Sequence, residues 1–161
     1  MNEIPYLVPF KAHHVEHVDM RPLDAQVFLS VPHSPSAVRA YETGGYSWTA
    51  ILDGRDTEPR VPTILGMGGI VPIWRGVACG WLLTACGIEH YAKFLHRTVT
   101  NVLNLAIKDL RLHRIETTIL ASHSISQRWA ERLGFKNEGL MRKFDMNGND
   151  YYRYALIKPW E

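Results

Sequence analysis

The strongest hydrophobic pattern in the chain lies over residues 88–110. At about 100° per residue, one face of a helix here would hold Tyr91, Ala92, Leu95, Val99, Val102, Leu103, Ala106 and Leu110. The opposite face would hold His90, Lys93, Arg97, Thr100, Asn101, Asn104 and Lys108. This separation of apolar from polar side chains predicts one long helix that packs through its apolar face.

Runs of aromatic and β-branched residues on both sides of this helix are typical of strands. They predict strands over 10–18, 46–52, 63–74, 76–84 and 114–121, and a hairpin with strands over 135–146 and 150–158 around Asn147-Gly148. Shorter helices are predicted over 19–31, 32–42 and 124–135. The glycines of 63–74 indicate a bulge or a close approach of backbones.

The order of these elements indicates the fold class. Short turns join the strands that precede the long helix, which makes them antiparallel, whereas the long helix is a crossover that makes 76–84 and 114–121 parallel. We therefore predict one α/β domain over residues 1–161, with a mixed, largely antiparallel sheet of six to seven strands flanked by about four helices.

Composition narrows the class of protein. The 161 residues are 46% hydrophobic and 21% charged, as in soluble globular proteins, and the net charge of +2 argues against a nucleic-acid partner. No apolar run of 18 residues or signal peptide is found, so we expect a cytoplasmic protein without a membrane partner. Cys79 and Cys86 do not form a CxxC pair, which argues against zinc-ribbon and thioredoxin-like sites.

The stretch HHVEH at residues 13–17 is the one candidate for metal binding. On a helix, His13 and His17 would share a face, as metal ligands do. On the predicted strand they would lie about 13 Å apart, which is too far for one ion. We therefore predict no metal site.

The stretch RIETTILASHSISQRWAERLGF, residues 114–135, resembles the GNAT superfamily of acyl-CoA-dependent N-acyltransferases. In that family a strand is followed by Asn-x-x-Ala/Ser, a short helix and Lys/Arg-x-Gly-Phe. Here His123 and Ser126 stand at the Asn and Ala/Ser positions, and residues 132–135 match the ending. The resemblance implies a GNAT-like acyl-CoA N-acyltransferase fold, acetyl-CoA or CoA as cofactor, and an amine as acceptor.

Three further stretches resemble a narrower group, the small GNAT-like proteins of short-tailed, podovirus-type bacteriophages. They are MRPLDAQVF (20–28), GWLLT (80–84) with Ile88-Glu89 and residues 94–97, and RWAERLGF (128–135). This resemblance implies a phage-encoded protein in the host cytoplasm or the virion, with a phage or host protein as partner.

The GNAT resemblance also implies where a cofactor would bind. Leu82, Leu83 and Thr84 on one strand, opposite Leu120 and Ala121 on the next, would receive the pantetheine arm, with Ser126 close by.

The loop that should hold the pyrophosphate departs from the family pattern, because Gln/Arg-x-x-Gly-x-Gly/Ala is absent between Trp81 and Phe94. Glu89 would also place a carboxylate in the first helical turn, where it would repel an anion. Side chains of His90, Lys93 and Arg97 could replace the missing backbone cradle. The alternative is that these three form the solvated face of an amphipathic helix.

Acyl transfer also needs a base for the amine and an acid for the thiolate. The family's acidic Tyr is replaced here by Ala130. Candidate bases are Glu116, which could equally face solvent, and His123, which could equally cap a helix. Two functions stay open: an acetyl-CoA-dependent N-acetyltransferase with a degenerate loop, and an inactive GNAT-fold protein that acts in virion assembly or binds a host protein.

Overall fold

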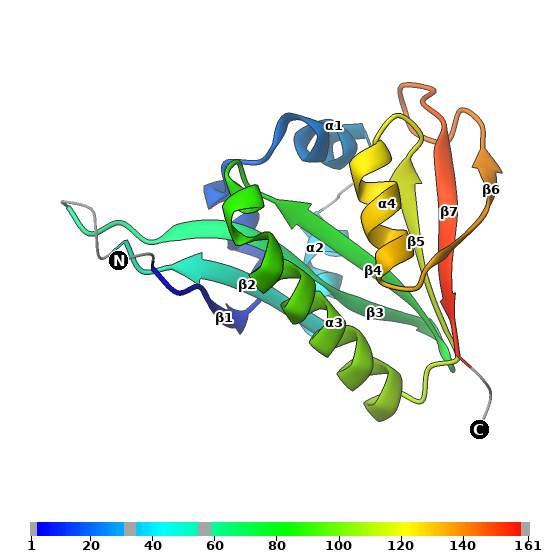
Figure 1. Cartoon of the computed structure of the whole chain (residues 1–161), viewed down its shortest axis with the longest axis horizontal. Helices are drawn as coiled ribbons and strands as arrows, with labels where there is room; N and C mark the ends of the chain where they lie inside the picture. Colours follow the sequence, from blue (N-terminus) through cyan, green and yellow to red (C-terminus); the bar gives the residue numbers. More distant parts are fainter. Residues whose placement is uncertain (1–2, 31–34, 55–58, 159–161) are drawn as a thin grey trace.

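A mixed sheet of seven strands forms the centre of the computed structural model, which describes residues 3–30, 35–54 and 59–158 (Figure 1). The strand order is β1-β2-β3-β4-β5-β7-β6, and β4–β5 is the parallel pair among these strands. The strands are β1 (Tyr6–Pro9), β2 (Tyr46–Leu52), β3 (Thr63–Trp74), β4 (Val77–Thr84), β5 (Arg114–Leu120), β6 (Lys136–Met141) and β7 (Tyr151–Ile157). The predicted fold class is confirmed.

Helices cover both faces of this sheet. The structure has α1 (Pro22–Ser30), α2 (Pro35–Thr43), α3 (Ala92–Asp109) and α4 (Ser124–Arg132), and two 3₁₀ helices, η1 (Ala12–His17) and η2 (Ile88–Tyr91). In Figure 1, α3 and α4 lie in front of the sheet, and α2 lies behind it. The predicted long helix is confirmed as α3, but its expected first turn is the separate 3₁₀ helix η2.

The predicted strand over 10–18 is wrong. The first strand lies earlier, at β1, and the chain then forms η1. Ala12, Val15 and Val18 all pack against the core around Phe10 and Met67. Their spacing of three residues matches the 3.0 residues per turn of a 3₁₀ helix and fits neither the alternation of a strand nor the period of an α-helix.

Because residues 12–17 form a 3₁₀ helix, the histidines of η1 also lie differently from the prediction. The His13 and His17 ring centroids are 6.4 Å apart, so the predicted strand separation is wrong. His14 is held differently, with Nδ1 2.8 Å from the Thr49 hydroxyl. Within the described residues, no group of three or more His, Cys, Asp or Glu side chains is arranged to hold a metal ion.

The hairpin predicted around Asn147-Gly148 is confirmed as the antiparallel pair β6–β7, but its connection is longer than a tight turn. Residues 142–150 form the loop, and the Gly148 N–H donates to the Asp145 carbonyl at 3.0 Å. The Asp145 carboxylate accepts the N–H groups of Asn147 and Asn149. The local polar contacts of this aspartate therefore shape the loop.

The glycines of β3 allow a close approach of backbones, as predicted. A Cβ on Gly69 would lie 2.5 Å from the Tyr46 carbonyl oxygen and closer still to the Ser47 hydroxyl. By contrast, a Cβ on Gly80 of β4 would meet its nearest neighbour, the Ile70 Cδ1, at an ordinary 3.5 Å.

We expect Gly69→Ala to destabilise the protein by about 1–3 kcal/mol, because β2 must move to accept the methyl group. For a protein of this size, that loss lowers the Tm by roughly 2–10 °C. Gly80→Ala is the matched control, and its Tm should be unchanged or slightly raised. Thermal unfolding followed by circular dichroism measures both. Equal Tm values for the two variants would contradict the close approach of β2 to β3.

Candidate functional site

The central feature of the site is the separation of β4 from β5. These strands pair only at Val77–Cys79 with Arg114–Glu116, after which they fan apart (Figure 1). α1 lies near the open end of the gap, and α4 lies in front of β5. The two strands that the GNAT resemblance assigns to the pantetheine arm are therefore splayed apart at this end.

Backbone groups of β4 face this gap at alternate residues. The Ala85 N–H donates to Leu65 of β3 at 2.9 Å, whereas the Thr84 carbonyl accepts the Arg21 N–H on the other side at 3.1 Å. Because strand residues alternate, the N–H and C=O of Leu82 point to the same side as those of Thr84. Of the three β4 residues predicted to bind cofactor, Leu82 presents its backbone to the gap. Leu83 directs its backbone to β3 and buries its side chain.

We call the open end of the β4–β5 gap the mouth. On its β5 side, backbone groups are held by hydrogen bonds within the protein. The Gln127 side chain of α4 donates to the carbonyls of Leu120 and Ala121 at 3.2 and 2.8 Å. The Ala121 N–H donates to the Asp150 carbonyl at 2.9 Å. Both backbone groups of Ala121 are thus already engaged. The sequence could have pointed to this role of Gln127, because a glutamine in the first turn of a helix can reach the end of the strand before it.

His123 and Ser126, both predicted site residues, lie together at this mouth. His123 precedes α4 and is only 7% exposed. Its Nδ1 lies 3.0 Å from the Ser126 Oγ. His123 occupies the N-cap position, but its side chain makes no capping hydrogen bond. His123 therefore stands at the predicted helix-entry position, but its ring does not cap the helix through a hydrogen bond.

α1 completes the mouth with residues that the sequence did not single out. The Asp24 carboxylate, in a residue only 9% exposed, accepts the Arg21 Nε–H at 2.8 Å and the Thr84 hydroxyl at 3.0 Å. These contacts tie α1 to the end of β4. The sequence signal was the i, i+3 pair of opposite charges, Arg21 and Asp24, at the start of a helix.

This environment sets the protonation state of His123. Burial lowers the pKa of the imidazole below its usual 6.5, and the nearby Arg21 guanidinium lowers it further, whereas Asp24 acts in the opposite direction. The ring is consequently neutral at pH 7 and can accept a proton.

The second predicted base, Glu116, lies in a different setting. Its carboxylate accepts hydrogen bonds from Arg114 at 3.0 Å and from Arg153 at 2.9 Å. Arg114 also binds both oxygens of Glu138, at 3.0 and 2.6 Å. Glu116 therefore links β5 to β7 within an ion-pair network. The alternative prediction was that Glu116 faces solvent. Its side chain is only 19% exposed, so this prediction is wrong.

We expect Glu116→Gln to lower the stability of the folded protein while leaving intact the acetyl transfer that the GNAT resemblance implies. Two guanidinium groups would lose a charged partner, and each such hydrogen bond contributes about 1.5–3 kcal/mol. Thermal unfolding and initial rates of acetyl transfer measure the two effects separately. A loss of rate at unchanged Tm would instead identify Glu116 as a base.

The β4–α3 loop has no glycine-lined cradle. Gly87 has a φ of 85°, and the N–H groups of Ile88 and His90 donate to the carbonyls of Ala85 and Gly87. Two of the loop amides are thereby used within the turn, and Glu89 is exposed there. The candidates for anion binding are then the exposed side chains His90, Lys93 and Arg97.

A contact between α3 and α4 lies next to these side chains. The Trp129 indole N–H donates to the His96 Nδ1 at 3.2 Å. At about 100° per residue, Lys93 lies roughly 60° around α3 from His96, and Arg97 roughly 100°. The basic stripe therefore lies on α3 next to the side that contacts α4.

Two tyrosines of the hairpin are engaged away from the gap, so neither is placed to serve as the acid for the thiolate. The Tyr154 hydroxyl lies 3.4 Å from Glu131, and the Tyr151 hydroxyl donates to Asp145 at 3.3 Å. Burial and Asp145 raise the pKa of Tyr151 to about 12. Ala130, at the family's Tyr position, is buried in the core.

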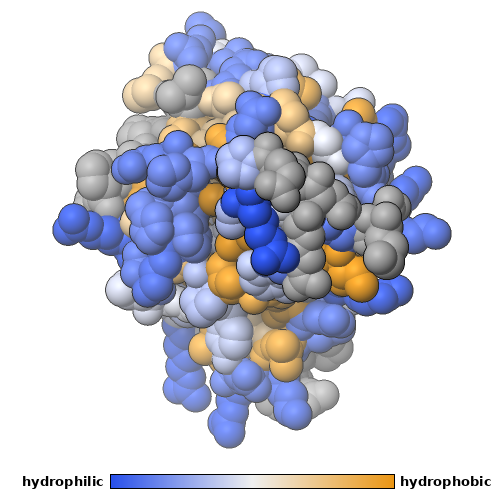
Figure 2. Space-filling model, turned by 90° about the vertical axis from the view of Figure 1, so that its left-hand side faces the viewer, coloured by the Kyte–Doolittle hydropathy of each residue, from blue (hydrophilic) through white to orange (hydrophobic). Residues whose placement is uncertain are grey.

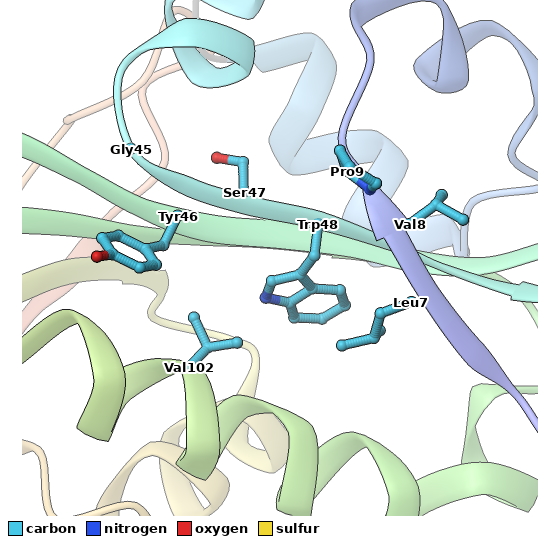
Figure 3. Close-up of a pocket in the computed structure, with 8 residues that line it drawn as sticks. All are labelled: Leu7, Val8, Pro9, Gly45, Tyr46, Ser47, Trp48 and Val102. Atoms are coloured by element: carbon cyan, nitrogen blue, oxygen red, sulfur yellow. The ribbon is translucent and has the colours of Figure 1, made fainter.

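An apolar pocket of about 400 Å³ lies apart from this site, between β1, β2 and α3. In Figure 3 the side chains of Leu7, Tyr46, Trp48 and Val102 line it, whereas Ser47 points to the other side of its strand. Figure 2 shows that hydrophobic residues on the left-hand face of the molecule form small patches broken by hydrophilic ones. The pocket contains none of the predicted site residues and supplies no base.

A parallel strand pair that separates within a mixed seven-stranded sheet is the arrangement that the GNAT resemblance implies. The model of the acetyltransferase (GNAT) domain family matches residues 7–136, and the chain belongs to this family. It is also similar to the uncharacterized N-acetyltransferase YoaA of Bacillus subtilis (strain 168), with 27% identity over 124 residues, or 74% of this chain and 67% of the relative. The predicted superfamily is confirmed.

Solved structures share the fold at lower identity. Ard1 from Thermoplasma volcanium has a TM-score of 0.73 at 11% identity and covers 96% of this chain and 98% of its own. A GNAT-family acetyltransferase from Bacillus anthracis has a TM-score of 0.64 at 20% identity, covering 95% and 94%. A point mutant of the spermidine N-acetyltransferase SpeG from Vibrio cholerae has a TM-score of 0.63 at 16% identity, covering 94% of each chain. Among the described residues, no helix is long and apolar enough to cross a membrane.

Proposed function

We propose that this protein is an acetyl-CoA-dependent N-acetyltransferase that uses His123 as its general base. The observation that carries this proposal is the position of His123, which is buried at the mouth of the β4–β5 gap and lies 3.0 Å from Ser126. A neutral imidazole can accept the proton that an amine loses during acetyl transfer, which is the role of a general base.

The residues around the gap fit an acyl-CoA. The Leu82 backbone offers an N–H and a C=O to an extended pantetheine amide chain, as a missing strand would. His90, Lys93 and Arg97 would hold the phosphates through charged side chains, in place of a glycine loop. Bound acetyl-CoA would supply the acetyl group as a thioester.

His123 acts on the acceptor. It accepts the proton that the amine nitrogen loses as that nitrogen bonds to the acetyl carbon and the carbon–sulfur bond breaks. Ser126 fixes the ring through its hydroxyl group. A thiol such as the cysteine side chain has a pKa of about 8.5, so a thiolate is a good leaving group and needs no strong acid. This is consistent with Ala130 at the family's Tyr position.

The predicted phage origin, and a role in the virion or on a host protein without catalysis, stay predictions. Neither the fold nor the family match bears on them, and no contact in the described residues favours them over acetyl transfer. The predicted cytoplasmic location likewise stays a prediction.

The test is an assay for release of free CoA thiol with acetyl-CoA and a panel of amines, paired with mass spectrometry of the acetylated product. The proposal is supported if thiol release depends on the amine and the product is about 42 Da heavier than that amine. This is the mass added when one acetyl group replaces one hydrogen. Bound acetyl-CoA without transfer to any amine would favour an inactive member of the family.

A further inference from the structure

A second pocket lies at the loop between β6 and β7, and the two described residues that line it are basic. Arg142 and Lys143 line a cavity of about 500 Å³. Both residues are exposed, and neither side chain forms a hydrogen bond or ion pair with another described residue. The arginines Arg114 and Arg153, by contrast, are held by carboxylates. The positive charge of this pocket is therefore available to a ligand.

Hydrogen bonds connect this pocket to the catalytic mouth. The Lys143 N–H donates to the Asp150 carboxylate at 2.8 Å. The Asp150 carbonyl in turn accepts the Ala121 N–H at 2.9 Å, and Ala121 is two residues before His123. The loop that carries the pocket is thus joined to the end of β5 that precedes His123.

The backbone of the loop holds its lysine in an unusual conformation. Lys143 has a φ of 50°, in the left-handed region that glycine and asparagine adopt more easily. The Asp150 contact and the hydrogen bond from the Phe144 N–H to the Asn149 carbonyl, at 2.8 Å, hold this geometry. The two aspartates of the loop direct carboxylate oxygens to loop amides, whereas the two cations line the pocket.

We propose, on the basis of the acetyl transfer proposed above, that this pocket binds the anionic group of a small acceptor. The acceptor class is then a compact molecule that carries both the reactive amine and a carboxylate or phosphonate. A cavity of this size suits a small molecule, and Arg and Lys form charge-assisted hydrogen bonds to such anions. The same two charges repel a polycation, so the acceptor differs in class from the spermidine named for the Vibrio cholerae neighbour.

The experiment compares kcat/KM for four acceptors: beta-alanine, aminoethylphosphonate, ethylamine and spermidine. We expect the two anionic amines to exceed ethylamine and spermidine by at least about tenfold. Arg142→Gln with Lys143→Asn removes both charges, and asparagine tolerates the positive φ. This variant should raise KM for the anionic amines and so lower their kcat/KM by about tenfold or more. The kcat/KM for ethylamine should stay unchanged. Lys136→Gln, on exposed β6, is the matched control.

The other outcomes overturn the inference in distinct ways. A preference for spermidine or ethylamine contradicts an anionic acceptor while leaving acetyl transfer intact. A weaker Kd for acetyl-CoA in the double variant assigns the pocket to the cofactor instead. If no amine is acetylated, the proposed function fails. Calorimetry with aminoethylphosphonate alone then still tests whether the pocket binds an anion. Binding that the double variant abolishes supports an anion site, and no binding to the wild-type protein contradicts it.

Discussion

Replacement of His123 by glutamine should lower the rate of acetyl transfer by about 10²–10⁴-fold, the usual contribution of a positioned general base. Glutamine keeps a polar side chain of similar reach beside Ser126 but cannot take up a proton at neutral pH. Initial rates of CoA release, at saturating acetyl-CoA and amine, measure the loss. The Kd for acetyl-CoA should change little, because the proton acceptor does not hold the cofactor.

The pH dependence gives a second readout for the same residue. His123 has a lowered pKa, so its neutral form persists below pH 6.5 and is lost only as the pH falls through the lower, folded-state value. The wild-type protein should keep its rate at pH 7 and lose it on an acid limb centred below 6.5. In His123→Gln that limb should disappear. A full rate in the variant, or an unchanged acid limb, would exclude His123 as the base.

Charge reversal on α3 should have an effect of similar size on cofactor binding. We expect Lys93→Glu with Arg97→Glu to raise the Kd for acetyl-CoA by about 100-fold or more. Each charge-assisted contact is worth about 1.5–3 kcal/mol, and each 1.4 kcal/mol is about a tenfold change in Kd. Isothermal titration calorimetry at low and high salt measures the change, and the wild-type affinity should itself fall with added salt.

Lys108→Glu is the control for this pair, because it reverses an exposed charge on the same helix, near its far end. Its Kd should match that of the wild-type protein. An unchanged Kd in the double variant would mean that Lys93 and Arg97 form only the solvated face of α3, which is the alternative that the sequence pattern left open.

The parts of the fold that follow from local periodicity could be predicted. The apolar face of α3 follows from a spacing of 3.6 residues. The antiparallel pairing before α3 and the parallel crossover after it follow from the short turns and the long helix that join the strands. η1 could not be predicted in this way, because its period of three over Ala12, Val15 and Val18 was interpreted as the irregular alternation of a strand. Its geometry depends on packing against Phe10 and Met67, and Met67 is distant in the sequence.

In the site, too, contacts between residues close in sequence could be predicted, whereas contacts between distant residues could not. The contact between His123 and Ser126 could be expected from the sequence, because they lie three residues apart within one motif. Asp24 was missed because its partner Thr84 is 60 positions away. The ion pair of Glu116 with Arg153 could not be predicted either, because Arg153, its partner on β7, is 37 positions distant in sequence. A sequence pattern gives the residue type, but only the fold shows which charges neutralise one another.

The most direct test is thermal unfolding of the wild-type protein with increasing acetyl-CoA. At 100 times its Kd, a ligand that binds only the folded state adds about 2.7 kcal/mol of stability. For a domain of this size that is a rise in Tm of roughly 5–10 °C. We expect this rise with acetyl-CoA and with CoA, and its loss in Lys93→Glu with Arg97→Glu. An unchanged Tm at millimolar acetyl-CoA would contradict acyl-CoA binding in the β4–β5 gap, and with it the proposed acetyl transfer.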